Sequence, residues 1–240
     1  MLLFYLLVKN HKFMNKKTVF ITGAGGFIGK NLVEKLNDNY HLLIPGRKEL
    51  DLLNEKVVDV FFKKNKIDIV INCAVIGGSR TEEYVDSSLS NNLRIFFNLL
   101  KNKDKFKKMI HLGSGAEYDK SKTIVKVKET DFGKTIPKDE YGFFKYICSK
   151  YIEKEENIVC LRIFGLFGKH EDFRFRFISN AIINNLKGLP IAINQNVFFD
   201  YVYINDFVKI VDYFINHKAE YKFYNIGSGK KIDILTIANE

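Results

Sequence analysis

Residues 18–29 read Thr-Val-Phe-Ile-Thr-Gly-Ala-Gly-Gly-Phe-Ile-Gly, and this stretch decides the fold. Its first five residues, Thr18–Thr22, are apolar or β-branched and predict a buried strand. Apolar residues then recur at helical spacing and predict a helix over Phe27–Leu36. Glycines stand at positions 23, 26 and 29, where the strand turns into the helix. A strand, a glycine turn and a helix in this order begin a βαβ unit of a parallel sheet.

The spacing of these glycines indicates a binding role. Gly23 permits a tight turn, Gly26 lets the backbone approach a phosphate, and Gly29 lets the helix pack closely on the strand. The helix N-terminus directs unpaired N–H groups at the anion. The alternative is a purely structural strand-to-helix turn. We expect a dinucleotide pyrophosphate to bind here, at Gly23, Gly26, Phe27, Ile28 and Gly29.

Extended and helical stretches alternate through the rest of the first region. The predicted strands are His41–Ile44, Asp68–Asn72, Lys108–Leu112 and Ile158–Ile163. The predicted helices are Lys56–Lys64, Leu89–Leu100 and Tyr141–Glu155. This alternation predicts a Rossmann-type α/β fold, a doubly wound parallel sheet with helices on both faces.

The pattern changes after Gly168. We expect residues 14–168 to form the dinucleotide-binding domain, and residues 169–240 to form mainly a small substrate lobe with parts returning to the sheet. A helix begins near Asp233, just before Glu240, which suggests a short or truncated lobe. Residues 1–13 precede Met14 and are expected to be a leader of little structural consequence. In the lobe we predict helices Phe173–Leu186 and Asp206–Ile215, and strands Ile191–Ile193 and Val197–Tyr203.

The composition is that of a globular protein, with 46% hydrophobic residues in 240. A net charge of +10 would suit an anionic partner, but the lysines are dispersed, so we expect a solvated surface and no nucleic-acid partner. Cys73, Cys148 and Cys160 lack C-x-x-C spacing, which argues against disulfides or zinc and fits a reducing cytoplasm. The apolar run Leu2–Val8 is too short for a membrane span. We therefore expect a cytoplasmic protein without a metal or a membrane.

The end of the second predicted strand indicates which dinucleotide is bound. A carboxylate there suits the ribose 2′-hydroxyl of NAD, whereas an arginine suits the 2′-phosphate of NADP. The sequence has Arg47 and Lys48 at this point and no acid before Glu49. NADP is therefore favoured, and NAD stays an alternative. A further alternative is that Arg47 and Lys48 form only a solvated turn. Asp51 and Leu52 are expected to meet the adenine ring.

Tyr141 and Lys145 are four residues apart on a predicted helix, so their side chains share a face. A neighbouring ammonium favours a phenolate and so helps a tyrosine to exchange protons near neutrality. Ser114 follows the fourth predicted strand and is the best candidate for a hydroxyl donor to a substrate oxygen. Downstream of a dinucleotide loop, these three residues predict proton-coupled hydride transfer.

Taken together, these motifs resemble the extended short-chain dehydrogenase/reductase family of nucleotide-sugar epimerases, dehydratases and reductases. The resemblance covers about residues 17–240. It implies that Ser114, Tyr141 and Lys145 are catalytic, that Cys73 and Ala74 line the cofactor site, and that a nucleotide-diphosphate sugar is the substrate. Further matches are Asn72–Ala74, Leu161–Gly168, Asp200–Asp206 and Tyr224–Gly229.

Many relatives dimerise through two long helices, here Leu89–Leu100 and the Tyr141 helix, so the resemblance implies a homodimer. Ile95, Phe96 and Phe97 are then either part of that surface or part of the core.

Within the family, the segment Gly46–Leu53 is most similar to GDP-L-fucose synthase-like reductases. The sequence departs from their pattern at three points. Ala116 stands where the synthase has its cysteine, Gly115-Ala116 replaces the Asp-Glu pair of dehydratases, and Phe199 replaces an arginine that holds the substrate diphosphate. Arg174, Arg176 or Lys187 could hold the diphosphate instead, or could be solvated helix charges.

Three functions remain open at this point. The first is an NADPH-dependent reductase of a 4-keto deoxy nucleotide sugar, in surface-polysaccharide biosynthesis. The second is a nucleotide-sugar 4-epimerase with retained NAD, which would use the same residues. The third is a non-catalytic dinucleotide-sensing or scaffold protein, against which the intact Ser114, Tyr141 and Lys145 argue.

Overall fold

A computed structural model describes residues 16–77, 87–121 and 124–240, and the predicted leader, 1–13, lies outside these ranges. At its centre is a six-stranded sheet in the order β2-β1-β3-β4-β5-β9. All neighbouring strands are parallel, which confirms the predicted Rossmann-type α/β fold. The strands are β1 (Thr18–Thr22), β2 (His41–Leu43), β3 (Ile69–Asn72), β4 (Lys108–Ser114), β5 (Ile158–Ile163) and β9 (Phe223–Ile226).

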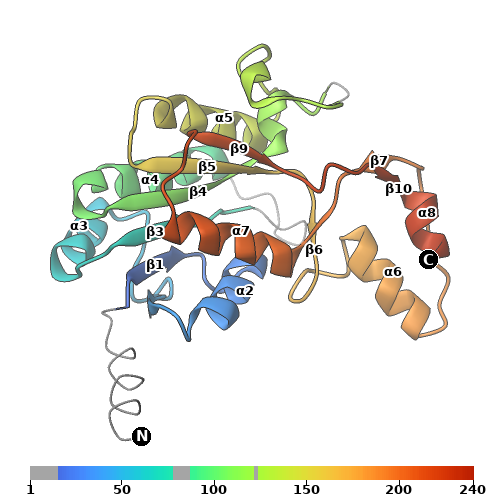
Figure 1. Cartoon of the computed structure of the whole chain (residues 1–240), viewed down its shortest axis with the longest axis horizontal. Helices are drawn as coiled ribbons and strands as arrows, with labels where there is room; N and C mark the ends of the chain where they lie inside the picture. The colour runs from blue at the N-terminus through green and yellow to red at the C-terminus, as the bar shows by residue number, and fades with distance from the viewer. Residues whose placement is uncertain (1–15, 78–86, 122–123) are drawn as a thin grey trace, which may run out of the picture.

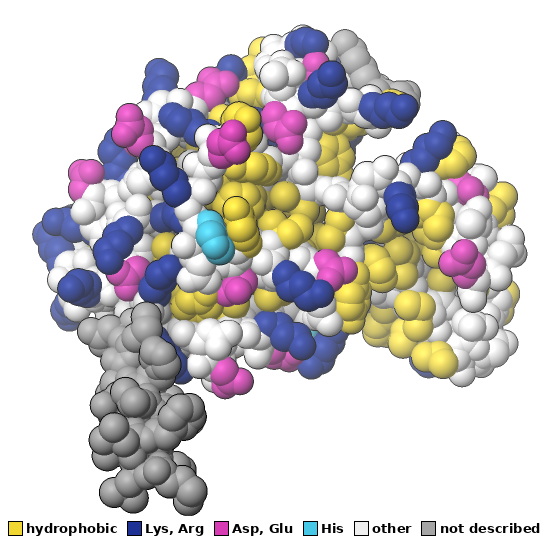
Figure 2. Space-filling model, in the orientation of Figure 1, with side chains coloured by type: hydrophobic (Ala, Val, Ile, Leu, Met, Phe, Trp, Pro, Cys, Tyr) yellow, Lys and Arg dark blue, Asp and Glu magenta, His cyan; other side chains and the backbone are white. Residues whose placement is uncertain are grey.

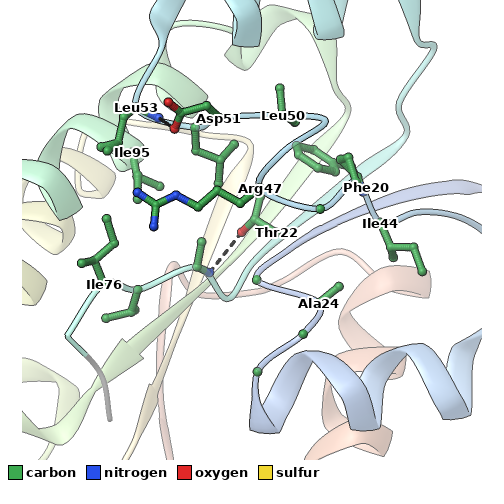
Figure 3. Close-up of a pocket in the computed structure, with 18 of the residues that line it drawn as sticks. Phe20, Thr22, Ala24, Ile44, Arg47, Leu50, Asp51, Leu53, Ile76 and Ile95 are labelled. Atoms are coloured by element: carbon green, nitrogen blue, oxygen red, sulfur yellow. Dashed lines mark hydrogen bonds between the residues drawn. The ribbon is translucent and has the colours of Figure 1, made fainter. Parts of the chain in front are cut away.

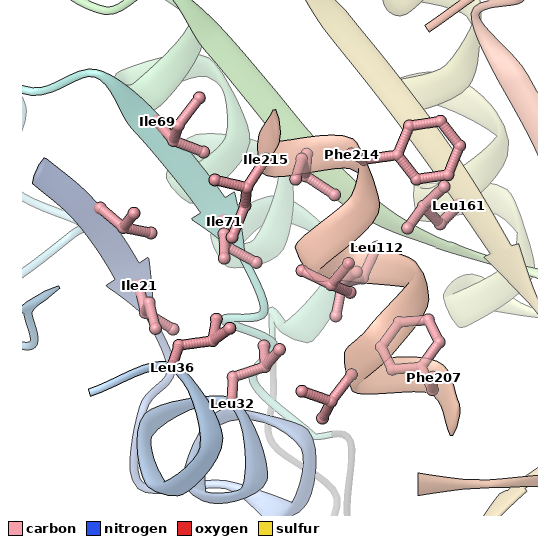
Figure 4. Packing of buried hydrophobic residues seen from close by; sticks show 14 of the residues in the cluster. Ile21, Leu32, Leu36, Ile69, Ile71, Leu112, Leu161, Phe207, Phe214 and Ile215 are labelled. Carbon is pink, nitrogen blue, oxygen red and sulfur yellow. The ribbon is translucent and has the colours of Figure 1, made fainter. Parts of the chain in front are cut away.

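Helices cover both faces of this sheet (Figure 1). Successive strand residues point to opposite faces, and both faces are covered, so the strands are mostly apolar. Ile21 packs on one side with Leu32 and Phe207, as Figure 4 shows, and Phe20 packs on the other with Val58. The first face carries α2 (Phe27–Leu36) and α7 (Ile204–Asn216), and the second carries α3 (Glu55–Lys64), α4 (Ser88–Leu100) and α5 (Glu140–Ile152).

Residues 164–240 contribute a smaller group of elements beyond the carboxyl ends of the strands (Figure 1). Two short pairs hold it together, β6 with β8 in parallel and β7 with β10 antiparallel. Its chain returns to the main sheet twice, as α7 and as β9. The elements of this lobe are β6 (Leu166–Phe167), α6 (Phe177–Leu186), β7 (Phe198–Phe199), β8 (Val202–Tyr203), β10 (Ile232–Asp233) and α8 (Ile234–Asn239).

The predicted boundaries hold best in the sheet. Strand Thr18–Thr22, helix Phe27–Leu36 and strand Ile158–Ile163 are confirmed as predicted. In the lobe two predictions were wrong. Residues 191–193 form no strand, and residues 197–203 divide into β7 and β8, because the turn between them directs the Asp200 carboxylate toward the backbone of Ser228.

Lys and Arg side chains are scattered among acidic ones over the face in Figure 2. None of the helices in the described ranges is both long and apolar enough to cross a membrane.

Candidate functional site

The glycine turn after β1 is held at the end of the sheet by Thr22. Its hydroxyl donates to Asn72 Oδ1 (2.8 Å) and accepts the N–H groups of Cys73 and Ala74 (3.1 Å each). These bonds join the carboxyl ends of β1 and β3. The helices that follow these two strands lie on opposite faces, and open α/β sheets bind ligands at such a switch point.

Only glycine fits at two positions of this turn. Gly23 has φ of 65°, and a Cβ there would lie 2.9 Å from the Ala74 backbone. At Gly29 a Cβ would lie 2.3 Å from the Gly23 carbonyl oxygen. The turn therefore brings its backbone, and the N-terminus of α2, directly against the adjoining pocket.

A pocket of about 640 Å³ opens beside the turn (Figure 3). Its walls are mainly apolar, and Arg47 and Asp51 supply its charged side chains. The glycine turn at a helix N-terminus fits the phosphates of a dinucleotide, and the apolar walls fit its adenosine. The one cation fits a 2′-phosphate. The lining residues are Phe20, Thr22–Gly26, Ile44–Arg47, Leu50–Leu53, Ala74–Ile76, Asn91 and Ile95.

Six predicted cofactor residues line this pocket: Gly23, Gly26, Arg47, Asp51, Leu52 and Ala74. Phe27, Ile28 and Cys73 instead pack against the core between the sheet, α2 and α7. Burial raises the pKa of the Cys73 thiol to about 12, so this thiol stays protonated. Sequence reasoning missed the apolar walls at Ile44, Leu53, Ile76 and Ile95. Ile44 and Ile76 come just after β2 and β3, which is the signal that could have found them.

The predicted catalytic residues come from β4 and α5. Ser114 is the last residue of β4, and its Oγ accepts the N–H of Ala116 (3.2 Å). Lys145 is buried, and its Nζ donates to the Leu112 carbonyl on the same strand (2.6 Å). The strand that ends in the hydroxyl therefore also holds the ammonium.

The Tyr141 ring lies beside two ammonium groups. Lys145 Nζ is 5.9 Å and Lys120 Nζ is 5.7 Å from its centroid. Tyr141 is 38% exposed, which leaves part of the ring open to a substrate. Sequence reasoning missed Lys120, which pairs with Asp139, the N-cap residue of α5 (3.1 Å).

Gly142 lets α5 approach the end of β4 closely. A Cβ at Gly142 would lie 2.7 Å from the Ala116 carbonyl oxygen. Ala116 belongs to the short 3-10 helix η3 (Gly115–Tyr118), which Ser114 caps. Tyr141, next to this glycine in the chain, is thereby held close to the segment that begins at Ser114.

The three predicted substrate cations do not form one group. Arg174 is paired with Asp172 through two bonds of 2.9 Å, and Arg176 is the N-cap residue of α6. Lys187 follows the other end of this helix, about 15 Å away. None of the three lines the pocket at the glycine turn.

The chain matches the model of the NAD dependent epimerase/dehydratase family over residues 19–227. It is 33% identical over 107 residues to GDP-L-colitose synthase of Yersinia pseudotuberculosis, which covers 42% of this chain and 35% of the relative. It is 23% identical to GDP-L-fucose synthase of Sinorhizobium fredii, over 94% of this chain and 79% of that protein.

Solved structures share the fold. A GDP-mannoheptose C4 reductase from Campylobacter jejuni with NADP bound has a TM-score of 0.78 at 20% identity, over 94% of this chain and 84% of that one. A dTDP-glucose 4,6-dehydratase from Bacillus anthracis in complex with NAD has a TM-score of 0.72 at 17% identity, over 93% and 79%. The family model matches most of the chain, which therefore belongs to the NAD dependent epimerase/dehydratase family, as the motifs indicated.

Proposed function

We propose that this protein is a cytoplasmic NADPH-dependent reductase of a 4-keto deoxy nucleotide sugar, acting in surface-polysaccharide biosynthesis. One observation carries the proposal: β4 and α5 bring Ser114, Tyr141 and Lys145 to the same edge of the sheet as the glycine turn. A buried alanine, Ala116, follows Ser114 where epimerising or dehydrating relatives have a proton-transfer group. Among the described residues of the site, we assign proton donation to Tyr141 alone, which suits reduction.

In this proposal the cofactor and three side chains each have one role in the reduction. NADPH, when bound, supplies the hydride for the keto carbon. Tyr141 donates its phenolic proton to the keto oxygen, so that a ketone becomes an alcohol. Ser114 donates a hydrogen bond to the same oxygen as negative charge grows on it, while its Oγ accepts the Ala116 N–H. Lys145, fixed by the Leu112 carbonyl, stabilises the charge left on Tyr141.

NADPH is preferred over NADH in this proposal because of Arg47. Arg47 lines the pocket, extends across it in Figure 3, and makes no hydrogen bond or ion pair with another residue of the described ranges. A guanidinium can bind a 2′-phosphate through two hydrogen bonds. Arg174, Arg176 or Lys187 is proposed to bind the nucleotide diphosphate of the sugar.

A nucleotide-sugar 4-epimerase with retained NAD is the second candidate. It rests on the same Ser114, Tyr141 and Lys145, which serve oxidation as well as reduction. The two reactions differ in whether the cofactor is consumed.

The test is incubation with a panel of 4-keto nucleotide sugars, with NADPH and NADH oxidation followed separately. We expect stoichiometric NADPH oxidation with one of them, and a fall in kcat of about 100-fold or more for Tyr141→Phe. Tyr151→Phe, on the same helix, is the matched control and should keep full activity. Oxidation of neither cofactor would exclude the reductase, and sugar interconversion without NADPH loss would favour the epimerase.

A further inference from the structure

A fully buried carboxylate lies beneath the candidate site. Glu117, in η3, has no solvent exposure. Its Oε1 accepts the backbone N–H of Ser114 (2.9 Å), and its Oε2 accepts the hydroxyl of Ser149 (2.7 Å) and Nε of Arg162 (2.7 Å). One side chain thus contacts the end of β4, the helix α5 and the strand β5.

Its partner, Arg162, is also fully buried. The guanidinium packs against the rings of Phe132 and Phe223, 4.2 and 4.3 Å from their centroids, and Nη1 donates to the Tyr118 hydroxyl (3.0 Å). Nη2 has no hydrogen-bond partner in the described part of the chain. Glu117 is therefore the anion that balances this buried cation.

The bonds of Glu117 join the two halves of the candidate catalytic set. Ser149 is four residues after Lys145, so both side chains lie on one face of α5. Oε2 holds that helix through Ser149, while Oε1 holds the backbone of Ser114. Glu117 thus adds a buried link between Ser114 and the helix of Tyr141 and Lys145, beside the direct bond from Lys145 Nζ to the Leu112 carbonyl.

The surrounding chain leaves space for this carboxylate. A Cβ at Gly113 would lie 2.6 Å from Glu117 Oε1 and from Cys160 Sγ. Burial raises the pKa of the Glu117 carboxyl, and Arg162 and the donated hydrogen bonds oppose that rise. Buried ion pairs add little net stability compared with apolar residues of similar volume. A gain in stability therefore does not explain why Glu117 and Arg162 are buried as an ion pair. A need to fix the geometry between Ser114 and α5 does explain it.

We propose that Glu117, held by Arg162, is a positioning residue that fixes Ser114 relative to Tyr141 and Lys145 for proton transfer to the substrate. This inference rests on the proposed reductase function. It assigns Glu117 no contact with substrate or cofactor, and so predicts an effect on kcat that depends on the Ser114 hydroxyl.

The experiment is a double-mutant cycle on the 4-keto nucleotide sugar that the wild-type enzyme reduces. Glu117→Gln should lower kcat about 10- to 100-fold, with KM and the NADPH Kd changed by less than about threefold. In a Ser114→Ala background the same change should cost less than about threefold, because the group that it positions is gone. Glu153→Gln, an exposed acid just after α5, is the control and should leave kcat unchanged.

Equal losses of kcat in both backgrounds, or a loss confined to KM or NADPH binding, would overturn the proposal. If Glu117→Gln does not fold, Ser149→Ala takes its place, since it removes one uncharged donor from the carboxylate. This variant should lower kcat about 3- to 10-fold, again only when Ser114 is present. Unchanged kcat in Ser149→Ala would then refute the positioning role.

Failure of the proposed function looks different. If none of the sugars in the panel supports NADPH oxidation by the wild-type enzyme, the reductase is excluded. Crystal structures then test the positioning role. Ser149→Ala should then move the Ser114 hydroxyl by about 0.5 Å or more relative to the Tyr141 hydroxyl. An unmoved Ser114 would overturn the proposal on its own.

Discussion

Single residues set the chemistry at the nucleotide pocket. Gly23 and Gly29 allow contacts of the backbone that any Cβ would block, and their role could be predicted from spacing alone. Arg47 was also found from sequence, because it follows the second strand where a ribose is expected. The apolar walls could not be found in this way, since an isoleucine after a strand looks like any other core residue.

At this scale we propose that Arg47 decides between the two dinucleotides. Arg47→Ala should weaken NADPH binding about 10- to 100-fold, because charge-assisted hydrogen bonds to the 2′-phosphate are lost. NADH binding should change by less than about threefold. Fluorescence titration of each cofactor measures both values. Lys48→Ala tests the neighbouring cation, and an equal loss of NADH affinity in Arg47→Ala would contradict the assignment.

At the scale of elements, β4 carries predicted catalytic groups on one hand and core packing on the other. It presents Ser114 and the Leu112 carbonyl to the site, and it buries His111 against Phe96 of α4, with ring centroids 5.2 Å apart. His111 Nδ1 lies 3.1 Å from Asn72 Nδ2, which is an N–H donor, so the imidazole is neutral and carries its proton on Nε2. Burial, and to a lesser degree Lys145, lowers the pKa of His111 well below its ordinary 6.5.

This burial makes stability depend on pH. Below about pH 6.5 the unfolded chain binds a proton that folded His111 does not. The free energy of unfolding therefore decreases as the pH is lowered. The slope from this residue approaches about 1.4 kcal/mol per pH unit. Urea denaturation between about pH 5 and 7.5 measures it.

Two variants isolate this contribution. His111→Gln should flatten that slope, whereas His217→Gln, at an exposed histidine, should leave it intact. A slope unaffected by His111→Gln would show that other groups cause it.

Elements with regular apolar periodicity were predictable, and those made by long-range contacts were not. Thr18–Thr22 and Ile158–Ile163 were found because all of their residues except Arg162 are β-branched or apolar. The predicted helix Phe173–Leu186 begins only at Phe177, because Asp172 accepts hydrogen bonds from Arg174 and ends the preceding turn. The role of Glu117 could not be predicted in this way, since nothing near it in the sequence indicates its contact with Arg162.

At the scale of the whole molecule, α4 and α5 present an aromatic pair to solvent. Ile95 and Phe96 are core residues, which leaves Phe97 as the outward member of the predicted dimer surface. Phe97 packs edge to face on Tyr151 at 4.7 Å, and Tyr151 is 47% exposed. Packing this pair against a second copy would bury the rest of its apolar surface.

We expect a homodimer through this face. Tyr151→Asp should weaken the dimer at least about 10-fold by placing a charge in an apolar contact. Sedimentation velocity over a range of protein concentrations measures the change. Tyr221→Asp alters a more exposed tyrosine elsewhere and should have no effect. A monomeric wild type would refute the arrangement.

The position of α7 along the chain has a consequence for biosynthesis. A ribosome delivers β1 to β5, with their glycine turn and Ser114, before Ile204–Asn216 emerges. Until then Ile21, Ile71 and Leu112 have no Phe207 or Val211 to cover them. The nascent protein thus carries a partly uncovered apolar sheet face until α7 is made, a state that chaperones bind and that aggregates when they are scarce.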